Sequence, residues 1–168
     1  MPGAGKSSAG RALSRVLGYR FVDLDVETER AAGKSIAELF GDGESVFRAA
    51  ERGALEAVAA RRRVVVAAGG GALADVDALA LARSAGAVVY LRVPATELAR
   101  RLAGAADRPL LLDGAGAPLR PVALRRRLRS LLLSREPVYR QANLVVDAHG
   151  RPMSDVAREI AEGLRRLS

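Results

Sequence analysis

The first residues that could do chemistry form a glycine-rich stretch that leads into a helical pattern. It comprises Gly3, Ala4, Gly5, Lys6, Ser7 and Ser8. The stretch matches the end of the phosphate-binding pattern G-x-x-x-x-G-K-[ST], whose first glycine would fall just before Met1. Backbone N–H groups in such a turn surround a phosphate at the positive end of the helix. We therefore predict a nucleotide site, in which Lys6 reaches the β- and γ-phosphates and Ser7 ligates Mg²⁺; a chance Gly-Lys-Ser is the alternative.

Two aspartates close the next apolar stretch, "YRFVDLD". The alternation predicts a short strand that ends in Asp23 and Asp25, with both carboxylates on one face. Ligands bind at the carboxyl ends of strands in parallel α/β sheets. The pair could therefore serve a metal and a substrate hydroxyl, although a solvated strand end or a helix cap would need the same residue type.

Basic residues at three further places could bind an anion. Arg48 and Glu51 stand three apart in "FRAAE", which also allows a simple surface ion pair. Arg108 lies in "DRPLL", within a loop rich in Gly, Pro and Ala, and could swing onto a transferring phosphoryl group. Arg135 lies in "SREPVYR" near the end of a predicted helix. The three glycines Gly69–Gly71 follow a strand directly and permit close approach of backbone to a ligand.

The elements that must position these residues alternate between strand and helix. Strands are predicted at 19–25, 64–68, 87–93 and 143–148. Helices are predicted at 6–17, 35–40, 44–62, 75–84, 95–104, 121–134 and from 154, where Ser154 would be the cap. The apolar run at 64–68 suits a strand covered on both faces. The order predicts one α/β domain with a parallel sheet.

Composition narrows the class of protein further. The 168 residues include no cysteine and a single histidine, which excludes disulfides and thiolate metal sites. No apolar run approaches the roughly 18–20 residues that span a membrane, and no signal peptide is evident, so we predict a cytoplasmic protein without a membrane partner. The net charge of +8 leaves open a nucleic-acid-binding module, but three Phe and three Tyr form no stacking platform.

Taken together, the chain resembles the shikimate kinases, in the nucleoside-monophosphate-kinase-like branch of P-loop proteins. The matching pieces are "GAGKSSAGRALSRVLG", "FVDLD", "SIAELF", "FRAAE", "VVVAAGGG", "VVYLRV", "RPLL" and "REPVYR", in family order across the whole chain. The resemblance implies a three-layer α/β/α P-loop fold with a helical lid. It divides the single domain 1–168 into a partial phosphate loop at 1–8, a substrate-binding region at about 26–62 and a lid at about 104–120. The implied reaction is ATP-dependent phosphorylation of the 3-hydroxyl of shikimate in aromatic amino acid biosynthesis, by a monomer with no nucleic-acid partner.

The resemblance also assigns roles to residues. Lys6, Asp25 and Arg108 would be catalytic, and Ser7 with Asp23 would hold Mg²⁺. ATP would contact Gly3, Ala4, Gly5, Lys6, Ser7, Ser8, Arg101, Arg108, Arg151 and Pro152. Shikimate would contact or be supported by Asp25, Arg48, Gly69, Gly70, Gly71, Arg135, Phe40, Phe47, Glu51, Pro109 and Leu110. The stretch "FGDGESVF" is one residue shorter than is usual in the family, which bears on the placement of Phe40.

One further departure concerns the start of the chain. The family has an apolar strand, central in the sheet, that ends in the first glycine of the loop, and nothing precedes Met1 here. Without that strand we expect its two neighbours to have unpaired edges. Each buried backbone group that lacks a hydrogen-bond partner costs about 1–3 kcal/mol of stability. A start assigned too far downstream is the simplest hypothesis. The alternatives for function are another small-molecule kinase of the branch, such as a gluconate kinase, or a truncated and inactive P-loop protein.

Overall fold

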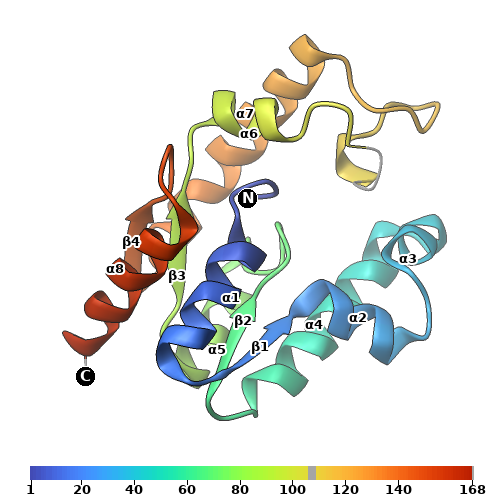
Figure 1. Ribbon diagram of the computed structural model, residues 1–168. Helices are drawn as coiled ribbons and strands as arrows, with labels where there is room; N and C mark the ends of the chain where they lie inside the picture. The colour runs from blue at the N-terminus through green and yellow to red at the C-terminus, as the bar shows by residue number, and fades with distance from the viewer. Residues whose placement is uncertain (106–108, 168) are drawn as a thin grey trace.

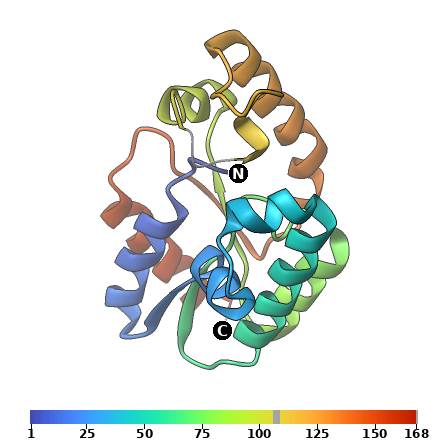
Figure 2. The same ribbon diagram turned by 90° about the vertical axis from the view of Figure 1, so that its right-hand side faces the viewer.

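The computed structural model describes residues 1–105 and 109–167 as an α/β domain in three layers (Figures 1 and 2). α1 (Lys6–Leu17) and α8 (Met153–Arg165) pack together on one side of the strands. α4 (Glu44–Ala59) and α5 (Val76–Ala85) lie on the other side, as Figure 2 shows. The predicted layers are therefore present.

The strands form two small parallel sheets. β1 (Arg20–Asp23) pairs with β2 (Val64–Ala67), with Arg20 opposite Val64 and Asp23 opposite Ala67. β3 (Val89–Arg92) pairs with β4 (Leu144–Asp147), with Val89 opposite Leu144 and Arg92 opposite Asp147. The strands were predicted in this order, and each is shorter than its apolar run.

A cavity of about 1320 Å³ separates the two sheets. Residues 64–69, in β2 and the turn after it, line one wall, and residues 88–91, in β3 and just before it, line the other. Within the described residues β2 and β3 belong to different sheets, so each turns an unpaired edge toward this space. This matches the prediction of a parallel sheet without its central strand. We call this space the inter-sheet slot.

Local sequence explains where most helices begin and end. Gly18 closes α1 in the left-handed conformation, at φ 66°. Ser35 and Glu38 form the predicted capping box of α3 (Ile36–Asp42), in which the Ser35 side chain accepts from the Glu38 N–H. α2 (Leu24–Ala32) was not predicted, since the alternating pattern favoured a strand through Asp25. Asp23 ends β1 and caps this helix instead.

Two boundaries at the carboxyl-terminal half differ from the prediction. α7 (Pro121–Tyr139) starts at Pro121 as expected but continues past residue 134 and through Pro137. α8 begins at Met153, so Ser154 lies inside the helix and bonds to the Asp155 carboxylate rather than capping. The longer α7 matters most, because it carries Arg135 and Tyr139 on a helix.

The buried apolar side chains form two cores. The larger core gathers side chains from α1, β3, α6 (Ala95–Arg101), α7 and α8, including the fully buried Leu98 and Leu128. The smaller core joins β1, α2, α4 and α5 around Leu24. Between α6 and α7, a 3-10 turn, η1 (Pro109–Leu111), lies in the predicted lid, and Leu112 bridges to Pro118.

Candidate active site

The glycine-rich turn ahead of α1 has the geometry of an anion-binding loop. Gly5 caps the helix in the left-handed conformation, at φ 85°, and no side chain caps the free N–H groups of the first turn. A β-carbon at Gly3 would lie 3.0 Å from the Leu102 side chain, and one at Gly5 would lie 3.1 Å from the Met153 sulfur. The packing therefore favours glycine at both positions. Lys6 extends from this turn, and its Nζ donates to the Met1 carbonyl at 2.7 Å.

Arg101 and Pro152, both predicted near the nucleotide, stand close to this loop. Arg101 donates from Nη1 to the Gly3 carbonyl at 3.2 Å, so α6 touches the loop directly. Arg151 pairs with Glu159 and the Asp147 carbonyl, and Pro152 stands just before Met153, which packs against Gly5. Ser7 and Ser8 are exposed at the start of α1. Arg108 lies outside the described residues.

Asp23 connects the loop to the end of β1. Ser7 donates its hydroxyl hydrogen to Asp23 Oδ2 at 2.8 Å, and Asp23 Oδ1 accepts from the N–H of Asp25 at 3.2 Å. The predicted juxtaposition of Ser7 and Asp23 is therefore present. Asp25 lies in the first turn of α2 rather than on a strand.

The second carboxylate, Asp25, meets Glu51 beside the glycine turn. A β-carbon at Gly69 would lie 2.5 Å from Oδ1 of Asp25 and 2.8 Å from Oε1 of Glu51. Only a glycine leaves room for both carboxylates against the backbone. Glu51 is 5% exposed. Burial raises its pKa, the pairing with Arg48 opposes that shift, and the negative charge of Asp25 adds to it.

Arg48 stands at the centre of a small network on α4. Its Nη1 donates to Glu51 at 2.7 Å, and its Nη2 donates to Glu44 at 3.1 Å. The guanidinium lies 5.0 Å from the Phe47 ring, and Phe47 stacks on Phe40 with centroids 4.4 Å apart. The shorter stretch before Phe47 thus still brings the two phenyl rings together.

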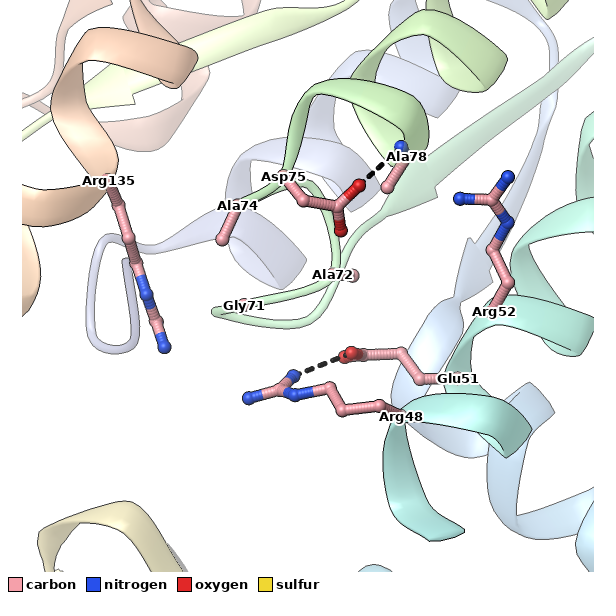
Figure 3. A pocket seen from close by; sticks show the side chains of 9 residues that line it. All are labelled: Arg48, Glu51, Arg52, Gly71, Ala72, Ala74, Asp75, Ala78 and Arg135. Atoms are coloured by element: carbon pink, nitrogen blue, oxygen red, sulfur yellow. Dashed lines mark hydrogen bonds and ion pairs between the residues drawn. The ribbon is translucent and has the colours of Figure 1, made fainter. Parts of the chain in front are cut away.

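Arg135 approaches the same place from α7. Its Nη1 donates to the Gly70 carbonyl at 3.0 Å. Figure 3 shows Arg135 and Arg48 entering one cavity from opposite sides, with Gly71 between them and Glu51 beside Arg48. The cavity measures about 390 Å³, the size of a small-molecule site. Its lining comprises Arg48, Glu51, Arg52, Gly71, Ala72, Ala74, Asp75, Ala78 and Arg135.

Some predicted substrate residues lie apart from this lining. Phe47 packs against the Arg48 guanidinium, and Phe40 stacks on Phe47. Pro109 and Leu110 belong to η1, where the Leu110 carbonyl accepts a hydrogen bond from Arg127. Sequence reasoning missed Arg52 and Asp75. Arg52 stands one residue after Glu51 and has no motif of its own. Asp75 carries the signal of a helix cap, and it does cap α5 through the Ala78 N–H.

Residues 1–105 and 109–167 offer neither a metal site made of side chains alone nor a membrane span. No three His, Cys, Asp or Glu side chains group closely enough to hold a metal by themselves. No helix in this part of the chain has the length and apolar composition needed to cross a bilayer.

Comparison with known proteins agrees with this geometry. The family model described as shikimate kinase matches residues 2–165. A shikimate kinase from Chlorobium chlorochromatii is 41% identical over 98% of this chain and 87% of its own length. The solved shikimate kinase from Acinetobacter baumannii in complex with shikimate has a TM-score of 0.88 at 32% identity, over 99% of this chain and 89% of that one. A gluconokinase from Sinorhizobium meliloti has a TM-score of 0.60 at 26% identity, over 98% of this chain and 87% of that one.

Proposed function

Because the chain belongs to the shikimate kinase family, we propose that it transfers the γ-phosphoryl group of ATP to the 3-hydroxyl of shikimate. The product is shikimate 3-phosphate, in aromatic amino acid (chorismate) biosynthesis. The main support for the proposal is that Arg48, Arg135 and the buried carboxylate of Glu51 line a single cavity of about 390 Å³. Gly70, beside that cavity, is in contact with Pro2 of the phosphate loop, since a β-carbon there would lie 3.0 Å from the Pro2 ring. The acid site and the nucleotide loop are therefore neighbours.

The cavity suits a small acid that carries several hydroxyls. Arg48 and Arg135 face it from α4 and α7, and arginine binds a carboxylate with two parallel N–H donors. Glu51 and the backbone of Gly69, Gly70 and Gly71 offer acceptors and donors for ring hydroxyls. Asp25 lies beside Glu51, where it would orient the attacking hydroxyl or accept its proton.

The nucleotide side needs charge neutralisation and alignment more than covalent chemistry. The backbone of residues 3–8 and the Lys6 ammonium would hold the phosphates at the start of α1. Arg101 borders this loop and Pro152 precedes Met153 at Gly5, and both would lie beside the nucleotide together with Arg151. Arg108 on the lid would reach the transferring group, as an arginine finger does.

Mg²⁺ fits the oxygen pair at the loop. Ser7 Oγ and Asp23 Oδ2 are 2.8 Å apart, and Mg²⁺ is usually held by one or two protein oxygens together with substrate phosphates. Held by Ser7 and Asp23, the ion would offset the negative charge that develops during phosphoryl transfer. Monomeric state and cytoplasmic location remain predictions from the sequence.

The test is a coupled ADP-release assay with Mg²⁺ and ATP. Shikimate, gluconate and no acceptor form its three arms. We expect ADP release with shikimate only, and mass spectrometry should find one phosphoryl group added to the acid. Turnover with gluconate alone would favour the alternative acceptor, for which the gluconokinase likeness is the supporting observation. Absence of turnover with both acids, in a folded sample, would favour the inactive alternative.

A further inference from the structure

The carbonyl of Gly70 accepts two hydrogen bonds from the same helix. Tyr139 donates its hydroxyl hydrogen at 2.8 Å, and Arg135 donates from Nη1 at 3.0 Å. The two donors stand four apart on α7, so they share one face of the helix. α7 therefore holds the centre of the glycine turn by two side chains.

The two donors differ in how firmly they are held. Tyr139 is 8% exposed, and its ring packs against Tyr90 of β3 with centroids 5.3 Å apart. Burial raises the pKa of the Tyr139 hydroxyl, so it stays protonated and able to donate across the neutral range. Arg135 is half-buried and also lines the 390 Å³ cavity. Only Arg135 can turn toward a ligand there.

The position of Gly70 affects both halves of the site. A β-carbon at Gly70 would lie 3.0 Å from the backbone nitrogen of Pro2, so the turn packs directly on the phosphate loop. One at Gly71 would lie 2.9 Å from Nη1 of Arg48. A shift of the glycine turn would therefore displace the wall of the cavity and the phosphate loop at the same time.

We propose that Tyr139 is a positioning residue for this turn, and that it keeps the Gly70 carbonyl in place when Arg135 binds the substrate's carboxylate. This inference rests on the proposed function. A carboxylate takes two N–H donors from an arginine, so it competes with the Gly70 carbonyl for Nη1 of Arg135. With Tyr139 still donating, the part-buried carbonyl keeps a partner, and the turn stays against Pro2 and Arg48. Without Tyr139, binding the acid would leave that acceptor unsatisfied.

The test compares Tyr139→Phe with Tyr90→Phe. Tyr139→Phe should raise KM for shikimate about tenfold, the effect of one hydrogen bond, while kcat falls less than about threefold. Tyr90 is the matched control, because its hydroxyl is buried and finds no hydrogen-bond partner in the described structure. Tyr90→Phe removes the same atom from the adjacent ring and should leave KM within about twofold. Equal rises in KM for the two variants would overturn the proposal, since ring packing alone would then explain them.

A second measurement is independent of turnover. Amide hydrogen exchange in residues 69–72 should be faster in Tyr139→Phe than in Tyr90→Phe, because the turn has lost a hydrogen bond that only Tyr139 makes. Wild-type protein that fails to phosphorylate shikimate would refute the proposed function and leave this comparison intact. Unchanged exchange in Tyr139→Phe would refute the role of Tyr139 even if the enzyme is active.

Discussion

Ser7 and Asp23 are joined side chain to side chain, with Ser7 Oγ donating to Asp23 Oδ2 at 2.8 Å. The contact links the first turn of α1 to the end of β1. Asp23 also caps α2 through the Asp25 N–H, so one carboxylate serves two structural purposes. Its negative charge is needed for neither purpose, since an amide there would still accept from the Asp25 N–H through its oxygen and could donate from its nitrogen to Ser7 Oγ. The charge is therefore free for a cation.

Replacing Asp23 by Asn should separate its structural contacts from its role in binding a cation. Asn caps helices as well as Asp does, so the melting temperature should change little. The Mg²⁺ concentration for half-maximal rate should rise by about tenfold or more, as it does when an outer partner of a metal site is removed.

The control for this variant is Asp75→Asn, which changes another capping aspartate in the same way at the start of α5. It should leave the Mg²⁺ dependence unaltered. An Asp23→Asn enzyme with the Mg²⁺ dependence of the wild type would remove Asp23 from the metal site.

Arg135→Ala should weaken binding of the acid more than it slows the chemical step. A charge-assisted pair contributes about 1.5–3 kcal/mol, so KM for shikimate should rise by about 10–100-fold. Arg140→Ala is the matched control, because Arg140 follows on the same helix, is exposed and pairs only with Glu136 among the described residues. Steady-state kinetics on both variants decides the matter, and an unaltered KM in Arg135→Ala would refute the carboxylate clamp.

The order of elements could be predicted from the sequence because each strand and helix carries its own local signal. Ser35 with Glu38 and Gly18 at a helix end are such signals, and both act as predicted. The stretch through Asp25 was mistaken for strand, because alternation continues across Leu24. Asp23 caps the chain into a helix there, and Leu24 is fully buried beneath it. An alternating apolar pattern favours a strand, whereas a capping aspartate favours the start of a helix. The pattern of apolar residues alone does not decide between the two.

The site was predicted where a motif fixes both residue type and spacing, as for Arg48, Glu51 and Arg135. Their meeting in one cavity depends on α4 and α7 lying on either side of the glycine turn, which no local pattern encodes. Tyr139 was missed for a related reason. The helix was expected to stop near Ser134, yet α7 passes through Pro137, where it loses only one N–H, and continues to Tyr139. That extra turn places the Tyr139 hydroxyl over Gly70.

Acid should weaken the packing of α2. Glu27 accepts from Arg61 at 2.6 Å and from Arg30 at 2.9 Å, and these arginines lower its pKa from 4.5 to about 2. A carboxylate with a depressed pKa stabilises the fold above its unfolded pKa, and that stability disappears as the pH falls through the folded value. Glu27→Gln should therefore lower the free energy of unfolding by about 1 kcal/mol near neutral pH. The difference from wild type should shrink below about pH 4.5 and vanish near pH 2.

Glu56→Gln provides the comparison, since Glu56 pairs with Arg52 on the exposed face of α4. Such an exposed pair is worth only a few tenths of a kcal/mol. Chemical denaturation at several pH values measures both variants. If Glu27→Gln lowers the free energy of unfolding by the same amount down to pH 2, the ion pairs of Glu27 do not cause the loss of stability.

The inter-sheet slot should accept an extended apolar segment. Unpaired edges of β2 and β3 face it, and apolar residues of α1 and α8, such as Leu13 and Ile160, close one side. Met1 is buried at its rim, where burial lowers the pKa of the amino group and the charges of Lys6 and Arg135 lower it further. Five apolar residues and a glycine joined ahead of Met1 would replace that buried amino group by an amide and could pair with both edges.

Such an extension should raise the melting temperature by roughly 6–12 °C, which corresponds to about 3 kcal/mol for a domain of this size. The control extension has the same length with proline at alternate positions. It also removes the buried amino group, but its prolines cannot donate the ladder hydrogen bonds that one of the two strand edges needs. The gain of the apolar over the proline-containing extension therefore isolates strand pairing. Equal melting temperatures for the two would mean that the slot does not take a strand.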